Sequence, residues 1–284
     1  MSYLCINQTC LIFDKQVVKY YDIEIADELM SKKVNTITLI IILLIFSGWY
    51  FNLTSLYYLI PLAILYIVIN IVGSANIQFN YFFSSYCRSA TTKKEIAITF
   101  DDGPHPEVTL KLISLLNSHN VKATFFCIGK NASEHHNIIS EMVNNEHLVG
   151  NHSYNHSNVF NLRSSKNMQK EILETNHIIT SIIGKSPILF RPPFGVANPM
   201  LSRAISRTNM VSVGWSLRSF DTVKEPEAVI AKLMANTKPG DVVLFHDTNP
   251  NIITIIEEYL LWLNKNDFKI VSLTSLLNIE AYEV

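Results

Sequence analysis

The chain has 284 residues, enough to bury a sizeable core in one large α/β domain or two small ones. Its 23 basic and 24 acidic residues nearly cancel, for a net charge of −1, and no basic run stands out, which argues against a nucleic-acid partner. The hydrophobic share of 48% is high for a soluble enzyme. One stretch of the chain accounts for it.

The N-terminal part of the chain changes composition abruptly. Residues 1–33 mix charged and apolar residues and do not resemble a secretory leader, and we assign them no role. Residues 34–87 contain no Asp, Glu, Lys or Arg. Within this tract, two segments, about residues 37–53 and 55–73, are strongly apolar. At about 17–20 residues each, they are near the lower length limit for helices that span a bilayer.

We expect this tract to form two membrane helices joined by a turn near residues 52–55, where Trp and Tyr residues cluster as they do at membrane interfaces. Two other interpretations stay open. In the first, the tract is a pair of buried core helices. In the other it is a cleaved signal peptide, although the apolar run starts late for a signal peptide.

The membrane topology also stays open. Lys32 and Lys33 favour a cytoplasmic N-terminus, and a hairpin would then return the rest of the chain to the cytoplasm. A single crossing, with the other segment lying in the interface, would place the rest of the chain outside. We expect a protein of the cell membrane whose C-terminal domain faces outside.

From Lys94 onward, short apolar segments alternate with amphipathic ones. The expected strands are residues 94–101, 122–128, 147–151, 187–191, 210–215, 241–246 and 268–273. The expected helices are residues 107–118, 132–145, 164–183, 198–207, 225–236 and 251–264. Such alternation is typical of parallel strands joined by crossover helices. Seven strands favour a barrel slightly short of eight, in which functional groups gather at the C-terminal ends of the strands.

The first polar cluster at a strand end is Thr99-Phe100-Asp101-Asp102-Gly103-Pro104. Asp101 and Asp102 close the expected strand, and the Gly-Pro pair turns the chain into a loop. At such a strand end, two adjacent carboxylates can reach one cleft and meet different partners. One can then bind a metal ion while the other stays free as a general base. Taken alone, the dipeptide is more commonly a solvated turn.

Two histidines follow the third expected strand. His152 and His156 are four residues apart, a spacing that places both imidazoles on one side of a helical turn, where they can bind one metal ion. Two histidines and a carboxylate leave coordination positions open, as in a catalytic site for zinc or a similar divalent ion. A lone His-x-x-x-His pair is at least as often a surface coincidence.

Arg191 ends the fourth expected strand and precedes two prolines, Pro192 and Pro193. The arginine is placed to hold a carboxylate by charge-assisted hydrogen bonds, and an ordinary salt bridge is the alternative. The prolines fix the backbone that follows, whose N–H groups can then point at a developing oxyanion.

Two later strands end in further functional candidates. Trp215 and Asp221 lie beyond the fifth strand, and Leu244 and His246 lie at the end of the sixth. A histidine supported by a carboxylate is a candidate general acid. Trp215 and Leu244 would form an apolar wall, with core packing as the alternative role.

As a set, these clusters resemble the five ordered motifs of the polysaccharide deacetylase family, also called the NodB-homology family or carbohydrate esterase family 4. The resemblance covers residues 94–275 and rests on Thr99–Pro104, His152–His156, Arg191–Phe194, Trp215–Asp221 and Leu244–His246. It implies an α/β fold, a distorted (β/α) barrel of about seven parallel strands. The apolar tract, which lies outside the family domain, places an N-terminal transmembrane helical segment before this barrel. The resemblance also implies a metal-dependent hydrolase that removes N-acetyl groups from amino sugars.

The resemblance assigns catalytic roles residue by residue. It implies that Asp101 is the general base, held by Arg191. It also implies that His246 is the general acid, partnered by Asp221. One departure weakens that partnership, because many members carry two acidic residues before a tryptophan in the fourth motif. Here only Asp221 remains, within residues 218–222.

The resemblance also implies binding residues. The implied ligands of a divalent metal, zinc first with cobalt, nickel and manganese open, are Asp102, His152 and His156. The implied substrate-binding residues are Pro193, Phe194, Trp215 and Leu244. Among these, Trp215 and Leu244 flank the acetyl methyl group, and the N–H of Phe194 stabilises the oxyanion.

The resulting hypothesis is a membrane-anchored, metal-dependent N-deacetylase of peptidoglycan or another N-acetylglucosamine-containing glycan of the cell wall. Its partners would be that glycan and the lipid bilayer. One alternative is a deacetylase or deformylase of a lipid-linked or precursor sugar. The other is a catalytically silent sugar-binding protein, which would be marked by a lost base, ligand or acid. None of these is lost here.

Overall fold

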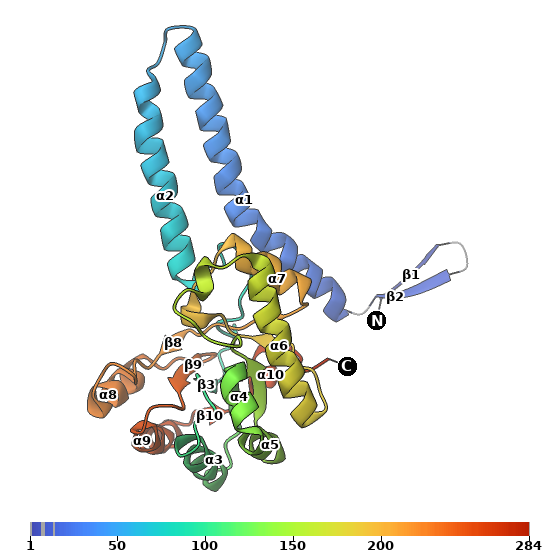
Figure 1. Cartoon of the computed structure of the whole chain (residues 1–284), viewed down its shortest axis with the longest axis vertical. Helices are drawn as coiled ribbons and strands as arrows, with labels where there is room; N and C mark the ends of the chain where they lie inside the picture. Colours follow the sequence, from blue (N-terminus) through green and yellow to red (C-terminus); the bar gives the residue numbers. More distant parts are fainter. Residues whose placement is uncertain (1, 7–8, 14, 284) are drawn as a thin grey trace. The chain divides into compact units, whose positions relative to one another are not determined.

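The computed structural model describes residues 2–6, 9–13 and 15–283, with side chains from residue 30 onward. The chain divides into two compact units, residues 1–84 and 85–284, and each has its own packing (Figure 1).

The first unit consists of a β-hairpin and two long helices. The hairpin pairs β1 (Ser2–Ile6) antiparallel with β2 (Thr9–Phe13). The helical elements are α1 (Lys15–Tyr50), η1 (Leu56–Tyr58), α2 (Leu59–Ala75) and η2 (Ile77–Phe79). Figure 1 shows α1 and α2 side by side, and the hydroxyl of Tyr66 on α2 donates a 2.9 Å hydrogen bond to Asn35 Oδ1 on α1.

Two helical segments of this unit are long and apolar enough to cross a membrane by length and composition. They are Met30–Tyr50 and Leu56–Ala75, and at most 6% of either span is buried. Helices of a soluble core bury most of their apolar side chains, and these do not. The expected segments 37–53 and 55–73 fall on these helices, but α1 begins much earlier, at Lys15.

The second unit is built on one parallel sheet. Its strands run in the order β7-β6-β5-β4-β3-β9-β8, and β10 also pairs with β3. The strands are β3 (Glu95–Asp101), β4 (Thr124–Cys127), β5 (Leu148–Asn151), β6 (Leu189–Phe190), β7 (Val211–Ser212), β8 (Leu217–Arg218), β9 (Val242–His246) and β10 (Lys269–Ile270). The pairings between these strands are all parallel, as the strand and helix alternation predicts.

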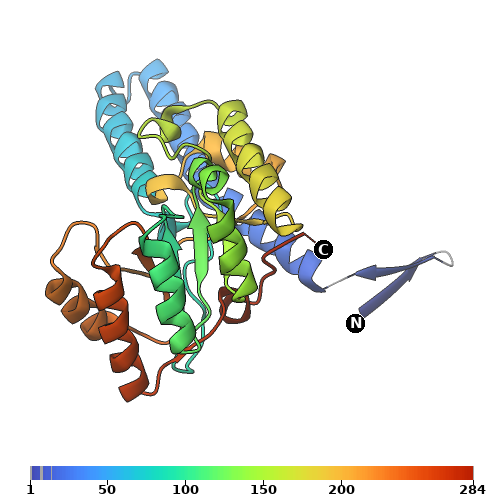
Figure 2. The same cartoon turned by 60° about the horizontal axis from the view of Figure 1, so that its bottom comes forward.

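Helices connect these strands and lie outside them in both views (Figure 1, Figure 2). They are α3 (Val108–Ser118), α4 (Gly129–Glu134), α5 (His136–Asn144), α6 (Ser165–Ile183), α7 (Pro199–Arg207), α8 (Pro226–Asn236), α9 (Ile252–Lys265) and α10 (Leu273–Leu277). Two short 3₁₀ turns, η3 (Phe160–Leu162) and η4 (Pro193–Gly195), lie in the loops. The result is the expected distorted barrel, a curled parallel sheet with an outer layer of helices.

Three details differ from the sequence-based expectation. The helix expected at 132–145 is two helices, because His135 leaves helical dihedral angles between α4 and α5. The strand expected at 210–215 is reduced to β7, and a separate strand, β8, follows it. The five-residue helix α10 is too short for its periodicity to be recognised in the sequence.

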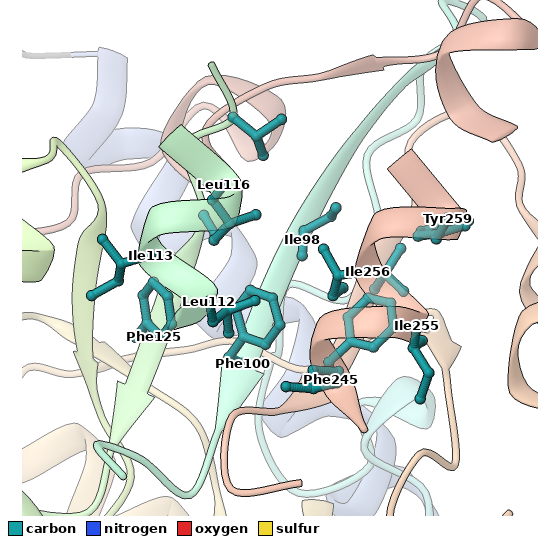
Figure 3. Packing of buried hydrophobic residues seen from close by; sticks show 14 of the residues in the cluster. Ile98, Phe100, Leu112, Ile113, Leu116, Phe125, Phe245, Ile255, Ile256 and Tyr259 are labelled. Atoms are coloured by element: carbon teal, nitrogen blue, oxygen red, sulfur yellow. The ribbon is translucent and has the colours of Figure 1, made fainter. Parts of the chain in front are cut away.

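The outer face of the sheet packs against the helices through a continuous hydrophobic core (Figure 3). Phe100 lies at its centre, with its ring 5.1 Å from that of Phe125 and 5.7 Å from that of Phe245. Successive side chains on a strand point to opposite faces, so Thr99 and Asp101 point to the inner face. Packing of Phe100 therefore orients the carboxylate next to it in the chain.

We predict that Phe100→Ala lowers the free energy of unfolding of this unit by about 3–5 kcal/mol, because it removes a fully buried ring and leaves a cavity. Urea unfolding followed by the fluorescence of Trp215 and Trp262 measures the effect. Leu162→Ala is the control, since Leu162 is 86% exposed and its truncation should change stability by less than about 0.5 kcal/mol. Equal effects of the two changes would contradict this description of the core.

Candidate active site

The polar residues predicted from the sequence meet at the C-terminal edge of the sheet. Asp101 ends β3 and is paired in register with His246, which ends β9. Two residues earlier, Thr99 pairs with Leu244. Because residues two apart share a face, all four side chains point to the inner side of the curled sheet.

Arg191 is completely buried and donates hydrogen bonds to four surrounding oxygens. Its Nη1 lies 2.8 Å from Asp101 Oδ1 and 2.7 Å from Thr99 Oγ1. Its other nitrogens donate to the carbonyl oxygens of Val213 and Gly214. Burial raises the pKa of Asp101, and the adjacent positive charge opposes that rise. The arginine therefore favours the ionised carboxylate and fixes its orientation.

Asp102 lies beside the two histidines. Its Oδ1 is 3.5 Å from the Nε2 atoms of both His152 and His156, and the three ligand atoms lie within 4.8 Å of one another. The same Oδ1 is buried and has no hydrogen-bond partner among the described residues. Neighbouring side chains that converge on an unpaired oxygen are arranged as ligands of a cation.

The Nδ1 atom of His152 lies 2.7 Å from the carbonyl oxygen of Arg191. Donation from Nδ1 to this oxygen leaves the Nε2 lone pair directed at Asp102. Burial, reinforced by the charge of His156, lowers the pKa of His152 to about 3. The imidazole is therefore neutral near pH 7, which is the state that binds metal.

The spacing of the two histidines predicted that they would converge through a helical turn. That prediction is wrong. Residues 152–156 form an irregular loop in which Ser153 and His156 have φ values of 63° and 47°. The Oδ1 atom of Asn151 accepts a hydrogen bond from the N–H of Ser153, and the Oγ of Ser153 accepts one from the N–H of His156. This tight loop folds the second histidine back toward the first.

His246 and Asp221 form a second buried pair. The Nδ1 atom of His246 is 2.9 Å from Asp221 Oδ1, and the N–H of His246 donates to Oδ2 at 3.0 Å. Burial lowers the pKa of His246, but the hydrogen bond and charge of Asp221 outweigh burial, so the pKa is raised. The pairing expected from the sequence is thus present, although the fourth motif carries a single acidic residue.

The four residues expected to contact substrate also lie at this edge. Leu244 and Pro193 are buried, and the ring of Trp215 packs against Gly195. Phe194 is 47% exposed, and its ring centroid is 4.6 Å from that of His156. These positions place apolar groups beside the polar cluster.

Asp247 was not anticipated by the sequence reasoning. It is fully buried under the Asp-Asp-Gly turn, accepts a 2.6 Å hydrogen bond from Thr109, and leaves no space for a side chain at Gly103. Burial raises its pKa to about 7. The sequence feature that could have identified Asp247 as part of the site is its position directly after His246 at the end of a strand. Asp247 supports the turn that carries Asp102.

Asp102, His152 and His156 fit a divalent cation. They offer one carboxylate oxygen and two imidazole nitrogens, a donor set that suits zinc and leaves coordination positions open. The unpaired buried oxygen of Asp102 and the neutral imidazole of His152 are the structural observations that support this assignment.

The fold and the site thus define a (β/α)-barrel protein with a candidate metal centre, an arginine-held carboxylate and a histidine–aspartate pair at one edge of its sheet. Comparison with known proteins agrees with this class. Residues 88–213 match the family model of polysaccharide deacetylases. The chain belongs to the polysaccharide deacetylase family.

Two curated relatives show the extent of the similarity. A peptidoglycan-N-acetylglucosamine deacetylase of Bacillus cereus is 35% identical over 157 residues, which are 55% of this chain and 57% of the relative. A chitooligosaccharide deacetylase of Azorhizobium caulinodans is 31% identical over 165 residues, 57% of this chain and 78% of the relative. The chain therefore spans just over half the length of the Bacillus relative.

Solved structures extend the comparison to the fold. The crystal structure of a peptidoglycan N-acetylglucosamine deacetylase matches with a TM-score of 0.66 and 28% identity, covering 70% of this chain and 95% of that one. A pseudoenzyme of this family from Bacillus anthracis matches with a TM-score of 0.62 and 26% identity, covering 67% and 68%. Because a protein named as a pseudoenzyme shares the fold, any argument for activity must rest on the site residues.

We predict that Asp221→Asn lowers the pKa of His246. The carboxylate raises this pKa against the effect of burial, so its removal leaves burial to favour the neutral imidazole. An NMR titration of the His246 imidazole in the metal-free, full-length chain measures the shift. Asp267→Asn, at an exposed aspartate, is the matched control. A His246 pKa that is equal in the two variants would show that the pair is not coupled.

Proposed function

We propose that this chain is a metal-dependent carbohydrate N-deacetylase that hydrolyses the N-acetyl amide of N-acetylglucosamine units in peptidoglycan or a similar glycan. One observation supports this most strongly: the carboxylate held by Arg191 lies beside the Asp102-His152-His156 group and opposite the His246–Asp221 pair. That arrangement supplies a base, a cation site and an acid within one site.

Asp101 is the proposed general base. Its Oδ1 is engaged by Arg191, while its Oδ2 lies 3.8 Å from His152 Nε2 and faces the group of candidate ligands. A water molecule bound there would give its proton to this carboxylate as it attacks the amide carbon. A divalent cation, when bound, would polarise the carbonyl and lower the pKa of water.

His246 is the proposed general acid. Asp221 holds its Nδ1, so Nε2 is directed away from that carboxylate and is available to the leaving amine. The raised pKa of His246 keeps the imidazolium populated, so that it can protonate the nitrogen as the C–N bond breaks. The base and the acid are register partners on adjacent strands, which places them about one strand spacing apart.

The remaining residues supply shape and a hydrogen-bond donor. Leu244 and Trp215 are proposed to enclose the acetyl methyl group, and Pro193 to fix the loop that follows Arg191. Phe194, at φ 62°, is proposed to direct its backbone N–H at the oxyanion that forms on the amide carbonyl.

The apolar helices support a membrane location. We propose that residues 34–87 hold the catalytic unit, residues 94–275, at the cell membrane, with that unit facing outside where a wall polymer is accessible. If both apolar helices cross the membrane, the unit lies on the same side as the residues before Met30, so it faces outside when those residues do and lies in the cytoplasm when Lys32 and Lys33 are cytoplasmic. In that case the substrate would be a lipid-linked or precursor sugar carrying an acetyl or formyl amide.

A catalytically silent protein would lack one of the titratable groups of the site. Asp101, Asp102, His152, His156, Arg191 and His246 are all present, and the contacts described above connect them. This retention favours an enzyme over a sugar-binding scaffold.

We predict that the full-length chain in detergent releases acetate from N-acetylglucosamine oligomers, that a chelator abolishes the release and that zinc restores it. The physical reason is that the three converging ligands hold the cation that stabilises the oxyanion, whereas the guanidinium of Arg191 is already engaged by Asp101 and His246 serves as the proton donor. Acetate is measured directly, and heat-denatured protein with zinc is the control. Release that persists after complete removal of metal would contradict the proposed mechanism.

A further inference from the structure

Three cationic side chains surround one aromatic ring beside the site. The Cζ atom of Arg218 lies 5.0 Å from the ring centroid of Phe220, and the Nζ atoms of Lys224 and Lys232 lie 5.6 Å and 4.6 Å from it. These are distances at which a cation interacts with an aromatic face. We call Arg218, Phe220, Lys224 and Lys232 the cationic cluster.

The cluster carries no compensating negative charge. Among the residues whose side chains the structure describes, none forms an ion pair with any of the three cations, and Glu225 and Glu227, which follow in the chain, are exposed. Burial and the charges of Lys224 and Arg218 lower the pKa of Lys232. The cations therefore repel one another, and an anion between them would relieve that repulsion.

The cluster adjoins the wall of the site. Arg218 on β8 is paired in register with Leu244 on β9, two residues before His246. Leu217 packs into the outer core, so alternation directs Arg218 to the opposite face, the one that carries Leu244. Its guanidinium is also 5.9 Å from the ring of Trp215. A substituent on a bound sugar, or on the next sugar along, is therefore within reach of the arginine.

The segment at the end of β8 carries one acidic residue close to the cluster. Arg218 is followed by Phe220 and then by a single acid, Asp221. Asp221 is engaged by His246 and Ser219, so it does not neutralise the cluster. The ring of Phe220 and the hydrogen bond from Lys232 to the carbonyl oxygen of Arg218 hold the three cations close together, and an oxyanion placed between them would be attracted by all three. The location of the cluster points to the substrate.

We propose that the cationic cluster is a subsite for an oxyanion group, phosphate or carboxylate, carried by the saccharide substrate next to the N-acetyl group that is cleaved. This inference rests on the proposed function and narrows its substrate to anionic glycans. Arg218 offers a planar fork suited to either group, and the two lysines add point charges. The aromatic ring gives the cations a fixed platform.

The test compares three substrates of the full-length, zinc-loaded chain in detergent. They are neutral chitotetraose, the same oligomer with a 6-phosphate, and an alternating N-acetylglucosamine–N-acetylmuramic acid tetrasaccharide, which carries carboxylates. We expect kcat/KM to be higher for one or both anionic substrates than for the neutral one. The preferred arm identifies the group, and the preference should fall with added salt.

Arg218→Glu is expected to lower the ratio of anionic to neutral kcat/KM about tenfold, mainly through KM, because one attractive contact becomes repulsive. Arg203→Glu, the same substitution at an exposed arginine on α7, should leave the ratio unchanged. If the ratio of anionic to neutral kcat/KM in the wild type is near one for both anionic substrates, the inference is overturned and the deacetylase proposal is unaffected. The same holds if Arg218→Glu and Arg203→Glu have equal ratios.

Equilibrium binding gives a readout that does not depend on turnover. Calorimetric titration with the phosphorylated and neutral oligomers should show tighter binding of an anionic oligomer, weakened by Arg218→Glu but not by Arg203→Glu. That result without acetate release would support the subsite and contradict the deacetylase activity. Equal binding of neutral and anionic oligomers would overturn the subsite.

Discussion

The ion pair between Arg191 and Asp101 is the interaction on which the site depends. Arg191 directly follows β6. It donates hydrogen bonds to Thr99 and Asp101 on β3 and to two carbonyl oxygens in the segment after β7. Its own carbonyl oxygen fixes His152. One residue thus connects three parts of the inner face with the candidate metal ligands.

Such a pair has an energetic cost. Both groups are removed from water, and a buried ion pair often contributes little net stability compared with apolar residues. The guanidinium offsets part of this cost through four hydrogen bonds and the ring of Phe126, whose centroid is 4.1 Å from Cζ. The arrangement is therefore better explained by the need for an oriented carboxylate than by fold stability.

The adjacent carboxylates of Asp101 and Asp102 have different surroundings at this edge of the sheet. Asp101 lies on the strand and is held by a cation, whereas Asp102 has a φ of 76° and turns toward the histidines. Asp247 and Thr109 support the turn from below. Backbone geometry thus assigns different partners to neighbouring residues, which is the basis of the proposed division between base and ligand.

Much of this arrangement was predictable from the sequence. Strands such as β3 and β9 are recognisable because their apolar residues form short runs bounded by turns, and parallel topology then brings their C-terminal ends together. Hydrogen-bond capacity identified Arg191 as a partner for a carboxylate. The resemblance to family motifs supplied the individual roles.

Other features depended on contacts that a sequence does not show. The irregular loop of His152 and His156 depends on positive φ angles stabilised by Asn151. The role of Asp247 depends on the close approach of Gly103, and the cationic cluster depends on β8 and α8 bringing Arg218 and Lys232 to one ring. Each is a tertiary arrangement between residues that have no local signature.

The most direct test of the account compares Asp101→Asn with Asp102→Asn, two equivalent changes at adjacent residues, by measuring zinc content and acetate release for each full-length variant. The account predicts that Asp101→Asn keeps its zinc but loses about 10²–10⁴-fold in turnover, whereas Asp102→Asn loses its zinc. Wild-type turnover in Asp101→Asn, or equal loss of zinc in both variants, would contradict the proposed division between base and metal ligand.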